Sequence, residues 1–328
     1  HRHSSAASDV YKRQLLELFK EDRFLYHLLS KRFSFDESQL ITDTLSKKMF
    51  LKIIAIRLLP LLTIVLGSLL VLRTLWSVLA SRKIEWKEFK PLDLDLLDMV
   101  LLISGGFVVL GEVISPLFSI TLVELVASNL SIELTQSLKI FFGYLFMAIP
   151  PLGIIYYQIK SFEKKIILKK DYFQFNFLPI KDSFFQGFKG FLMIIPFVLL
   201  VSLIMNLLVD NQNGSNPLLE IVLNSNNYLS FLLLFLTTTF LAPIFEEIIF
   251  RGVLLPILSR EFGIILGITI SAFIFALAHL SIGEMIPLFT LGIGLGTTRL
   301  ISGRLSSSVI MHSLWNGMTF LNLFLLRT

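Results

Sequence analysis

The sequence predicts an all-α fold, a polytopic membrane helical bundle of about eight transmembrane helices. Composition gives two indications: 54% of the residues are hydrophobic and only 16% are charged, whereas an ordinary soluble domain has about 25% charged residues. A third indication is that windows of about 18 or more mainly apolar residues recur from Phe50 onward, and a helix of that length crosses the hydrocarbon core of a bilayer. Such a chain must be solvated largely by lipid.

Eight apolar windows account for the predicted helices. They lie near residues 53–76, 99–119, 138–159, 190–209, 229–256, 262–280, 285–301 and 306–326. The last four windows are joined by very short connections. We therefore expect them to pack as one compact bundle in which neighbouring helices are antiparallel.

Four parts of the chain are distinguished by composition. Residues 1–14 resemble the translation of a sequencing adapter and are interpreted as a non-native leader that does not belong to the fold. Residues 15–49 mix apolar and charged residues, so we expect a helical segment outside the bilayer. Residues 50–210 are predicted to be an N-terminal transmembrane region with basic inner loops. Residues 228–328 are predicted to be a four-helix core that contains every candidate catalytic residue.

The distribution of basic residues predicts an orientation. Residues 160–189 contain seven lysines, whereas residues 119–137, 210–227 and 280–284 contain no Lys or Arg. Because basic loops stay in the cytoplasm, we expect the 160–189 loop inside the cell. The basic N-terminal segment conflicts with this scheme, which places it outside. We expect a bacterial inner membrane or a thylakoid-like membrane, and no nucleic-acid partner despite the net charge of +5.

Ionisable side chains enter the apolar windows of the predicted core, where charge is costly and therefore indicates function. Glu246, Glu247 and Arg251 all fall in the window 229–256. Glu247 and Arg251 are four residues apart and share a helix face, so we expect them to pair. Glu246 projects about 100° away from that face. Left without that partner, Glu246 is a candidate general base.

Histidine and amide side chains complete the set of candidate residues. His279 and His312 are the two histidines of the membrane region, and each lies in its own window. Asn316 follows His312 by one helical turn, and Phe275 precedes His279 by one turn. Three predicted helices thus bring acids, imidazoles and an amide to one bundle.

Three motifs in this order resemble those of the CAAX prenyl protease and bacteriocin-processing family (CPBP, Abi-like) of glutamic-type intramembrane proteases. The first is the Glu-Glu-x-x-x-Arg box that begins at Glu246. The second is Phe-x-x-x-His, which ends at His279, and the third is His-x-x-x-Asn, from His312 to Asn316. The resemblance covers roughly residues 231–324. Any one box is a weak signal, but three in order inside apolar windows are specific.

The resemblance implies an intramembrane endopeptidase, a hydrolase that cleaves a peptide bond of a membrane-associated protein or peptide substrate. It implies that Glu246 with His279 activates a water molecule. It also implies that His312 and Asn316 stabilise the oxyanion of the tetrahedral intermediate, as preorganised donors in a water-poor site can.

Two interpretations of the cofactor follow from the same resemblance. We favour metal-free hydrolysis with no cofactor, because no histidine pair has the His-Glu-x-x-His spacing of zinc proteases. The alternative is zinc, with Glu246, His279 and His312 as ligands and an open position for water.

Other assignments compete with catalysis. The resemblance implies that Glu247 and Arg251 hold the site together, but they could also be a structural ion cluster with Glu246. The whole bundle could be a non-catalytic membrane scaffold, a chaperone or a bacteriocin-immunity factor.

The sequence also weighs against other protease chemistries. The chain has no cysteine, no Asp beyond Asp210 and no Gly-x-Ser-x-Gly elbow. Residues 306–308, three serines, are interpreted as a helix N-cap. The glycines of residues 292–296 lie inside an apolar window, which predicts close helix packing and not a nucleotide loop. The lone charges Arg57 and Glu112 in early windows are interpreted as snorkelling or pairing residues.

Overall fold

The structure, a computed structural model, describes residues 43–80, 85–89, 94–127, 130–163, 177–208 and 227–326, together with Glu17, Gln174 and Ile221; of residues 43–53, 55–57, 159, 161–163 and 326 it describes the backbone alone. The predicted leader, most of the 15–49 segment and the lysine-rich stretch around residues 164–170 lie outside the described residues. The chain divides into two compact units, residues 1–60 and 61–328.

Every regular element in the described part of the chain is a helix, so the all-α prediction is confirmed. The first helix whose bounds the described residues give is α3 (Asp43–Leu79). A second helical run consists of α4 (Leu96–Leu101), the π-helical η2 (Leu102–Ile114) and α5 (Ser115–Val126). Its start is fixed by a capping box, in which the Asp95 carboxylate accepts the backbone N–H of Asp98 at 2.8 Å.

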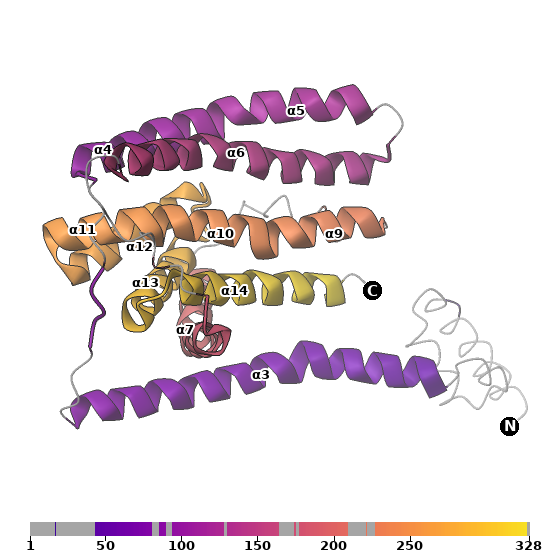
Figure 1. The fold of residues 1–328 in the computed structure, drawn as a ribbon. Helices are drawn as coiled ribbons and strands as arrows, with labels where there is room; N and C mark the ends of the chain where they lie inside the picture. Colours follow the sequence, from indigo (N-terminus) through magenta and orange to yellow (C-terminus); the bar gives the residue numbers. More distant parts are fainter. Residues whose placement is uncertain are drawn as a thin grey trace, which may run out of the picture. The chain divides into compact units, whose positions relative to one another are not determined.

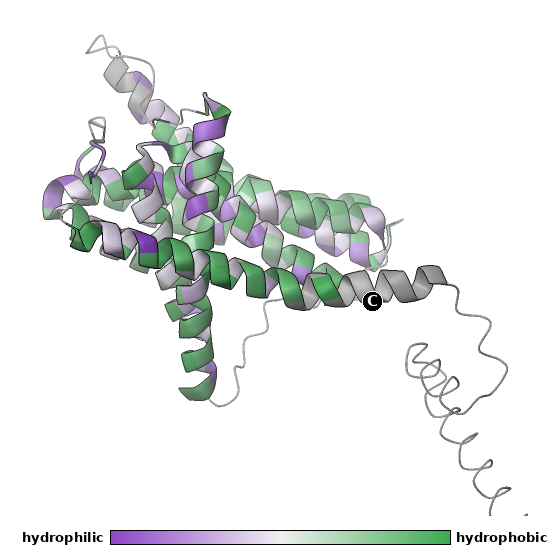
Figure 2. Cartoon of the chain, turned by 90° about the horizontal axis from the view of Figure 1, so that it is seen from below, coloured by the Kyte–Doolittle hydropathy of each residue, from purple (hydrophilic) through white to green (hydrophobic). Residues whose placement is uncertain are grey.

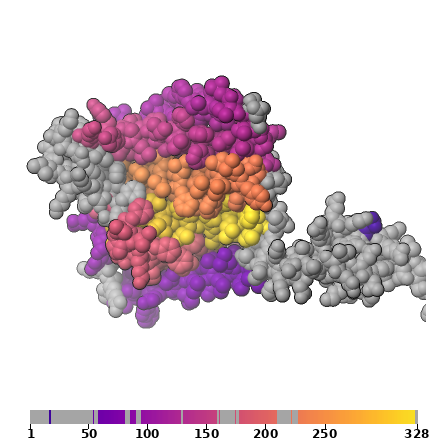
Figure 3. Space-filling model, turned by 45° about the vertical axis from the view of Figure 1, so that its right-hand side comes forward, coloured from indigo at the N-terminus to yellow at the C-terminus, as the bar shows by residue number. Residues whose placement is uncertain are grey.

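The helix α6 (Ile132–Glu163) returns alongside η2 and α5, as Figure 1 shows. Glycine allows these helices to approach closely, because a Cβ atom at Gly111 would lie 2.9 Å from the carbonyl oxygen of Met147. The next helix, α7 (Ile180–Leu208), packs on the two last helices of the chain. In Figure 3, the pink residues of α7 adjoin the yellow C-terminal helices, and residues 70–80 at the end of α3 line a cavity with α7.

The helical run that carries both glutamates is continuous from Tyr228 to Phe262. It comprises α9 (Tyr228–Leu236), η4 (Thr237–Leu241), α10 (Ala242–Glu247), η5 (Ile248–Leu254) and α11 (Leu255–Phe262). Its start is capped by Asn227, whose side-chain oxygen accepts the N–H of Leu229 at 2.9 Å. Two π-helical segments flank α10, and π-helical turns inside α-helices often occur at functional sites.

Three further helices complete the C-terminal part: α12 (Ile264–Ala278), α13 (Met285–Ser302) and α14 (Leu305–Leu326). The turns before α12 and α14 each use a glycine with positive φ, Gly263 at 83° and Gly303 at 67°. The predicted role of the 292–296 glycines is confirmed at Gly292, where a Cβ atom would lie 2.9 Å from that of Ala272. Close packing of α12 on α13 therefore requires glycine there.

Six of the described helical runs are long and apolar enough to cross a membrane by length and composition, which supports a multi-pass integral membrane protein. They are Leu58–Leu79, Leu96–Val126, Ile132–Gln158, Ile180–Leu208, Tyr228–Phe262 and Met285–Ser302. Figure 2 shows hydrophobic residues along most of their length. The predicted count of eight is not confirmed. The window 262–280 forms a helix of only 15 residues, and the apolar sequence of the continuous helix α14 is broken by His312, Asn316 and Asn322.

The largest core cluster surrounds the glutamate-bearing helix with phenylalanine rings. Phe245 and Phe250 both contact Phe107 of η2, with ring centroids 5.8 and 5.9 Å apart. Phe250 also packs edge-on against Phe275 of α12 at 5.3 Å. These rings are at most 4% exposed, so they exclude water from one side of the polar residues described next.

Candidate functional site

Glu247 is the centre of the polar network in the bundle, and it is completely buried. Its Oε1 accepts a hydrogen bond from Nη1 of Arg251 at 2.7 Å and lies 2.9 Å from Nδ1 of His312. Its Oε2 accepts the hydroxyl of Ser308. A buried carboxylate needs such donors, because burial without partners is costly. The predicted pairing of Glu247 with Arg251 is therefore present, and α14 contributes two further partners.

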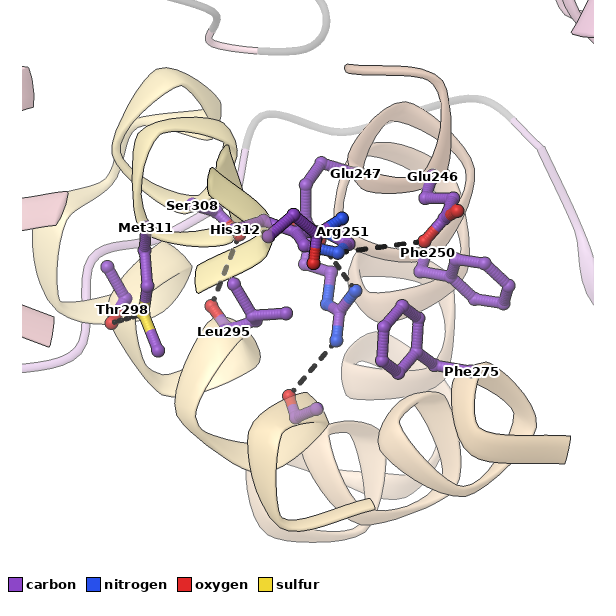
Figure 4. A network of polar contacts seen from close by, with 12 residues as sticks. Glu246, Glu247, Phe250, Arg251, Phe275, Leu295, Thr298, Ser308, Met311 and His312 are labelled. Carbon is purple, nitrogen blue, oxygen red and sulfur yellow. Dashed lines mark hydrogen bonds and ion pairs between the residues drawn. The ribbon is translucent and has the colours of Figure 1, made fainter. Parts of the chain in front are cut away.

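Arg251 is fully buried and is held by three elements. Besides Glu247, its Nη2 donates to the carbonyl oxygen of Gly292 on α13 at 3.2 Å. Its guanidinium carbon lies 4.4 Å from the centre of the Phe275 ring on α12, a cation–π contact. Figure 4 shows Arg251 between these groups. The residue thus connects α12 and α13 to the helix that carries the acids.

Glu246 points away from Arg251 toward His312, as Figure 4 shows. Its Oε2 lies 3.8 Å from Nε2 of His312, which is too long for a hydrogen bond, and accepts none from the described residues. The residue is 7% exposed, and it lines a cavity of about 420 Å³. The two adjacent glutamates therefore differ: one is saturated with donors and the other faces a cavity.

The same cavity brings together three of the residues predicted from sequence. His279 and Asn316 line it with Glu246. His279 is exposed at the end of α12, and its Nδ1 lies 2.8 Å from the carbonyl oxygen of Phe275. Asn316 donates through Nδ2 to the carbonyl oxygen of Thr238 at 2.9 Å. Among the described contacts, neither side chain bonds directly to Glu246.

His312 has a different place from the one that the resemblance implies for an oxyanion donor. It is 2% exposed, and its two ring nitrogens face Glu247 and Glu246. It is not among the residues that line the cavity. Its ring also packs edge-on against Phe275, with centroids 5.6 Å apart.

Sequence reasoning missed several residues of this site. The interpretation of residues 306–308 as an N-cap is wrong for Ser308, because its hydroxyl bonds to Glu247 from inside α14. Ser306 instead bonds to Ser183 on α7 at 2.9 Å. Tyr144 of α6 lines the cavity, and no motif marks it. A serine one turn before His312 on the same helix face was the available signal for Ser308.

Glu112 is a second residue whose interpretation changes. It is half-buried in η2 and close enough to Glu246 for the two carboxylates to interact electrostatically. A third acid therefore lies near the cavity, in a part of the chain where the sequence showed no motif.

The alternative zinc set would need Glu246, His279 and His312 to lie close together. Within the described ranges, no three side chains of His, Cys, Asp or Glu gather closely enough to hold a metal ion. These three residues are therefore not grouped as a ligand set in this arrangement, and the choice between metal-free hydrolysis and zinc stays a prediction.

Residues 228–318 match the family model described as "Type II CAAX prenyl endopeptidase Rce1-like". This part of the chain is Rce1-like. The match covers less than a third of the 328 residues, and it confirms the resemblance to CAAX proteases that three motifs indicated. Searches of curated proteins and of solved structures gave no match. All six predicted site residues lie within the Rce1-like region, whereas Glu112 and Tyr144 lie outside it.

Proposed function

We propose that this protein is an intramembrane endopeptidase that hydrolyses a peptide bond of a membrane-associated protein or peptide. The observation that carries the proposal is the asymmetry of the two glutamates. Glu247 is saturated by three donors, whereas Glu246 lines a cavity and accepts no hydrogen bond from the described residues. A general base needs that freedom to reach a water molecule.

The buried cluster combines two acids with Arg251 and His312, so oppositely charged groups lie within reach of both glutamates. Buried charge is tolerated best when compensated.

In the proposed reaction, Glu246 removes a proton from a water molecule in the cavity while the water oxygen attacks the peptide carbonyl carbon. The Nδ1–H of His279 donates to the carbonyl oxygen of Phe275, so Nε2 is left to accept a hydrogen bond from the other O–H of that water, which stays on the water oxygen. The proton on Glu246 then passes to the nitrogen of the cleaved bond. The products are a carboxylic acid and an amine, with one water consumed.

The oxyanion of the intermediate requires donors that are already in place. Asn316 uses one hydrogen of its amide to bond Thr238, and its second amide hydrogen is assigned to the oxyanion. His312 is not assigned a bond to the oxyanion, because it does not line the cavity and its Nδ1 is bonded to Glu247. Glu247, Arg251 and Ser308 are positioning residues that hold His312 and the helix of Glu246.

The test uses the full chain in liposomes with two quenched fluorescent peptides of identical sequence, one of them prenylated at a C-terminal CAAX cysteine. A mass-spectrometric comparison of membrane peptides, in cells that carry wild type or Glu246→Gln, accompanies this assay.

Glu246→Gln should reduce cleavage at least about 100-fold, the usual contribution of a general base, and Asn316→Ala should have an effect of similar size. Cleavage that persists in Glu246→Gln would refute its role. If neither peptide is cut and the membrane peptides of wild type and Glu246→Gln agree, the non-catalytic scaffold is favoured.

A further inference from the structure

Two adjoining cavities lie apart from the Glu246 cavity and share no lining residue with it. The first, of about 670 Å³, is formed by the last turns of α3 and the first half of α7. The second, of about 410 Å³, lies between α7 and α13. Thr74 and Lys189 line both, so the two cavities form one groove, called the α7 groove below.

One end of the α7 groove is positively charged. Arg73 and Lys189 are the ionisable residues that line it, and no acidic side chain does. Within the described part of the chain, no carboxylate forms an ion pair with either cation. The groove therefore fits an anion.

Both cations lie inside apolar spans. Arg73 is six residues before the end of the span Leu58–Leu79, which is about 9 Å at 1.5 Å per residue. Lys189 is nine residues into the span Ile180–Leu208. Charges at this depth require a counter-charge or a path to the interface. Trp76, one turn after Arg73 and 75% exposed, is the type of residue that marks the headgroup level.

The other end of the α7 groove is apolar. Its wall from α7 consists of Met193, Ile194 and Phe197, and its wall from α13 includes Ile293 and Gly294, which packs against Ile194. A basic end near the interface that continues into an apolar channel matches the two parts of a phospholipid, and basic pockets between transmembrane helices bind anionic headgroups.

We propose that the α7 groove binds one anionic phospholipid, with its phosphate at Arg73 and Lys189 and one acyl chain between α7 and α13. The lipid would contact α13, the helix whose Gly292 carbonyl holds Arg251. The proposal does not depend on the enzymatic activity proposed above.

The test measures lipid retention by the purified full chain in native mass spectrometry, with phosphatidylglycerol and phosphatidylcholine of identical acyl chains. Wild type should retain phosphatidylglycerol about 30-fold better, because the two basic residues together contribute on the order of 2 kcal/mol to anionic lipid binding and each 1.4 kcal/mol is about tenfold. The double variant Arg73→Gln/Lys189→Gln should lose this preference. Thr290→Phe, which fills the apolar end, should weaken retention of both lipids.

Lys160→Gln is the matched control. Lys160 is an exposed lysine near the end of α6 that lies over the Tyr156 ring and lines neither cavity, so its loss should not alter retention. Thermal unfolding without added lipid shows whether each variant is folded, and the upward shift of Tm caused by phosphatidylglycerol gives a second readout. Equal retention of both lipids by wild type, or an unchanged preference in the double variant, would overturn the proposal. Displacement of the lipid by inorganic phosphate at millimolar concentration would do so as well.

Discussion

Glu246 and Glu247 are adjacent in the chain but have opposite surroundings, and helical phase explains the difference. A rotation of about 100° per residue turns Glu247 toward Arg251, Ser308 and His312, and Glu246 toward the cavity. One residue type can thus serve two roles in one helical turn. Substitutions of single residues should therefore distinguish effects on stability from effects on cleavage.

Arg251→Ala should destabilise the protein, because it leaves Glu247 charged and buried without its main counter-charge. Removing one partner of a buried ion pair costs about 3–5 kcal/mol. Glu246→Gln keeps the shape of the side chain and breaks no hydrogen bond from a described residue, so its stability should stay near wild type. Thermal unfolding in detergent measures both. Equal destabilisation by the two changes would favour a purely structural ion cluster.

The serines that begin α14 provide a sharper comparison. Ser308 donates to Glu247, whereas the hydroxyl of Ser307 is buried without a hydrogen-bond partner among the described residues. Ser308→Ala should therefore cost about 1–3 kcal/mol, the effect of removing a donor from a buried charged group. Ser307→Ala should be neutral or stabilising, since it removes an unsatisfied group. Chemical or thermal unfolding of the pair decides the assignment, and a loss of equal size in both variants would contradict it.

Sequence alone predicted the six candidate residues and the pairing of Glu247 with Arg251, because a four-residue spacing fixes two side chains on one helix face. It could not predict Gly292 as a partner of Arg251, or Tyr144 and Glu112 near the cavity. These contacts join helices distant in sequence. Only the packing of α6, η2 and α13 around the glutamates determines them.

At the scale of the elements, short turns position the helices that carry the site. Gly263 separates α11 from α12 with φ 83° and ψ 161°, a conformation that is essentially restricted to glycine. A Cβ atom there would meet nothing within 4 Å. Any cost of a side chain at this turn is therefore backbone strain and not a clash.

Gly263→Ala should reduce the free energy of unfolding by about 1–3 kcal/mol. Gly105→Ala is the control, since a Cβ atom there also meets nothing within 4 Å and its φ is not positive. At such a compatible position, alanine stabilises by about 0.4–1 kcal/mol through the unfolded chain. Unfolding measurements on both variants give the comparison. A neutral Gly263→Ala would show that the turn tolerates a side chain.

The element boundaries were less predictable than the helices themselves. The window 229–256 is part of a run that continues to Phe262 and includes two π-helical segments. Apolar periodicity cannot reveal these segments, because they change the local helical pitch without changing composition.

The number of membrane-spanning helices could not be fixed from the sequence for a related reason. The polar residues that make α14 a site helix also lower its hydropathy, so composition alone does not place it in the membrane.

For the whole molecule, the orientation in the membrane stays a prediction from loop charges. The turn between α5 and α6 has no Lys or Arg, whereas the segment before α7 is lysine-rich. Positive loops remain cytoplasmic, so the start of α6 should lie outside the cell and the start of α7 inside. The chain has no cysteine, which makes single introduced thiols unambiguous probes.

Ile132→Cys and Lys181→Cys test this orientation at exposed positions near the starts of α6 and α7. An impermeant maleimide applied to intact cells should label the cysteine at position 132 and not the one at 181, and permeabilisation should make both reactive. Labelling only at 181 would reverse the orientation. Labelling at both positions in intact cells would show that α6 does not separate the two sides, and the bundle would then have fewer spans than its apolar helices permit. Because α6 supplies Tyr144 to the cavity wall, that outcome would also change how the Glu246 cavity is placed relative to the two sides of the membrane.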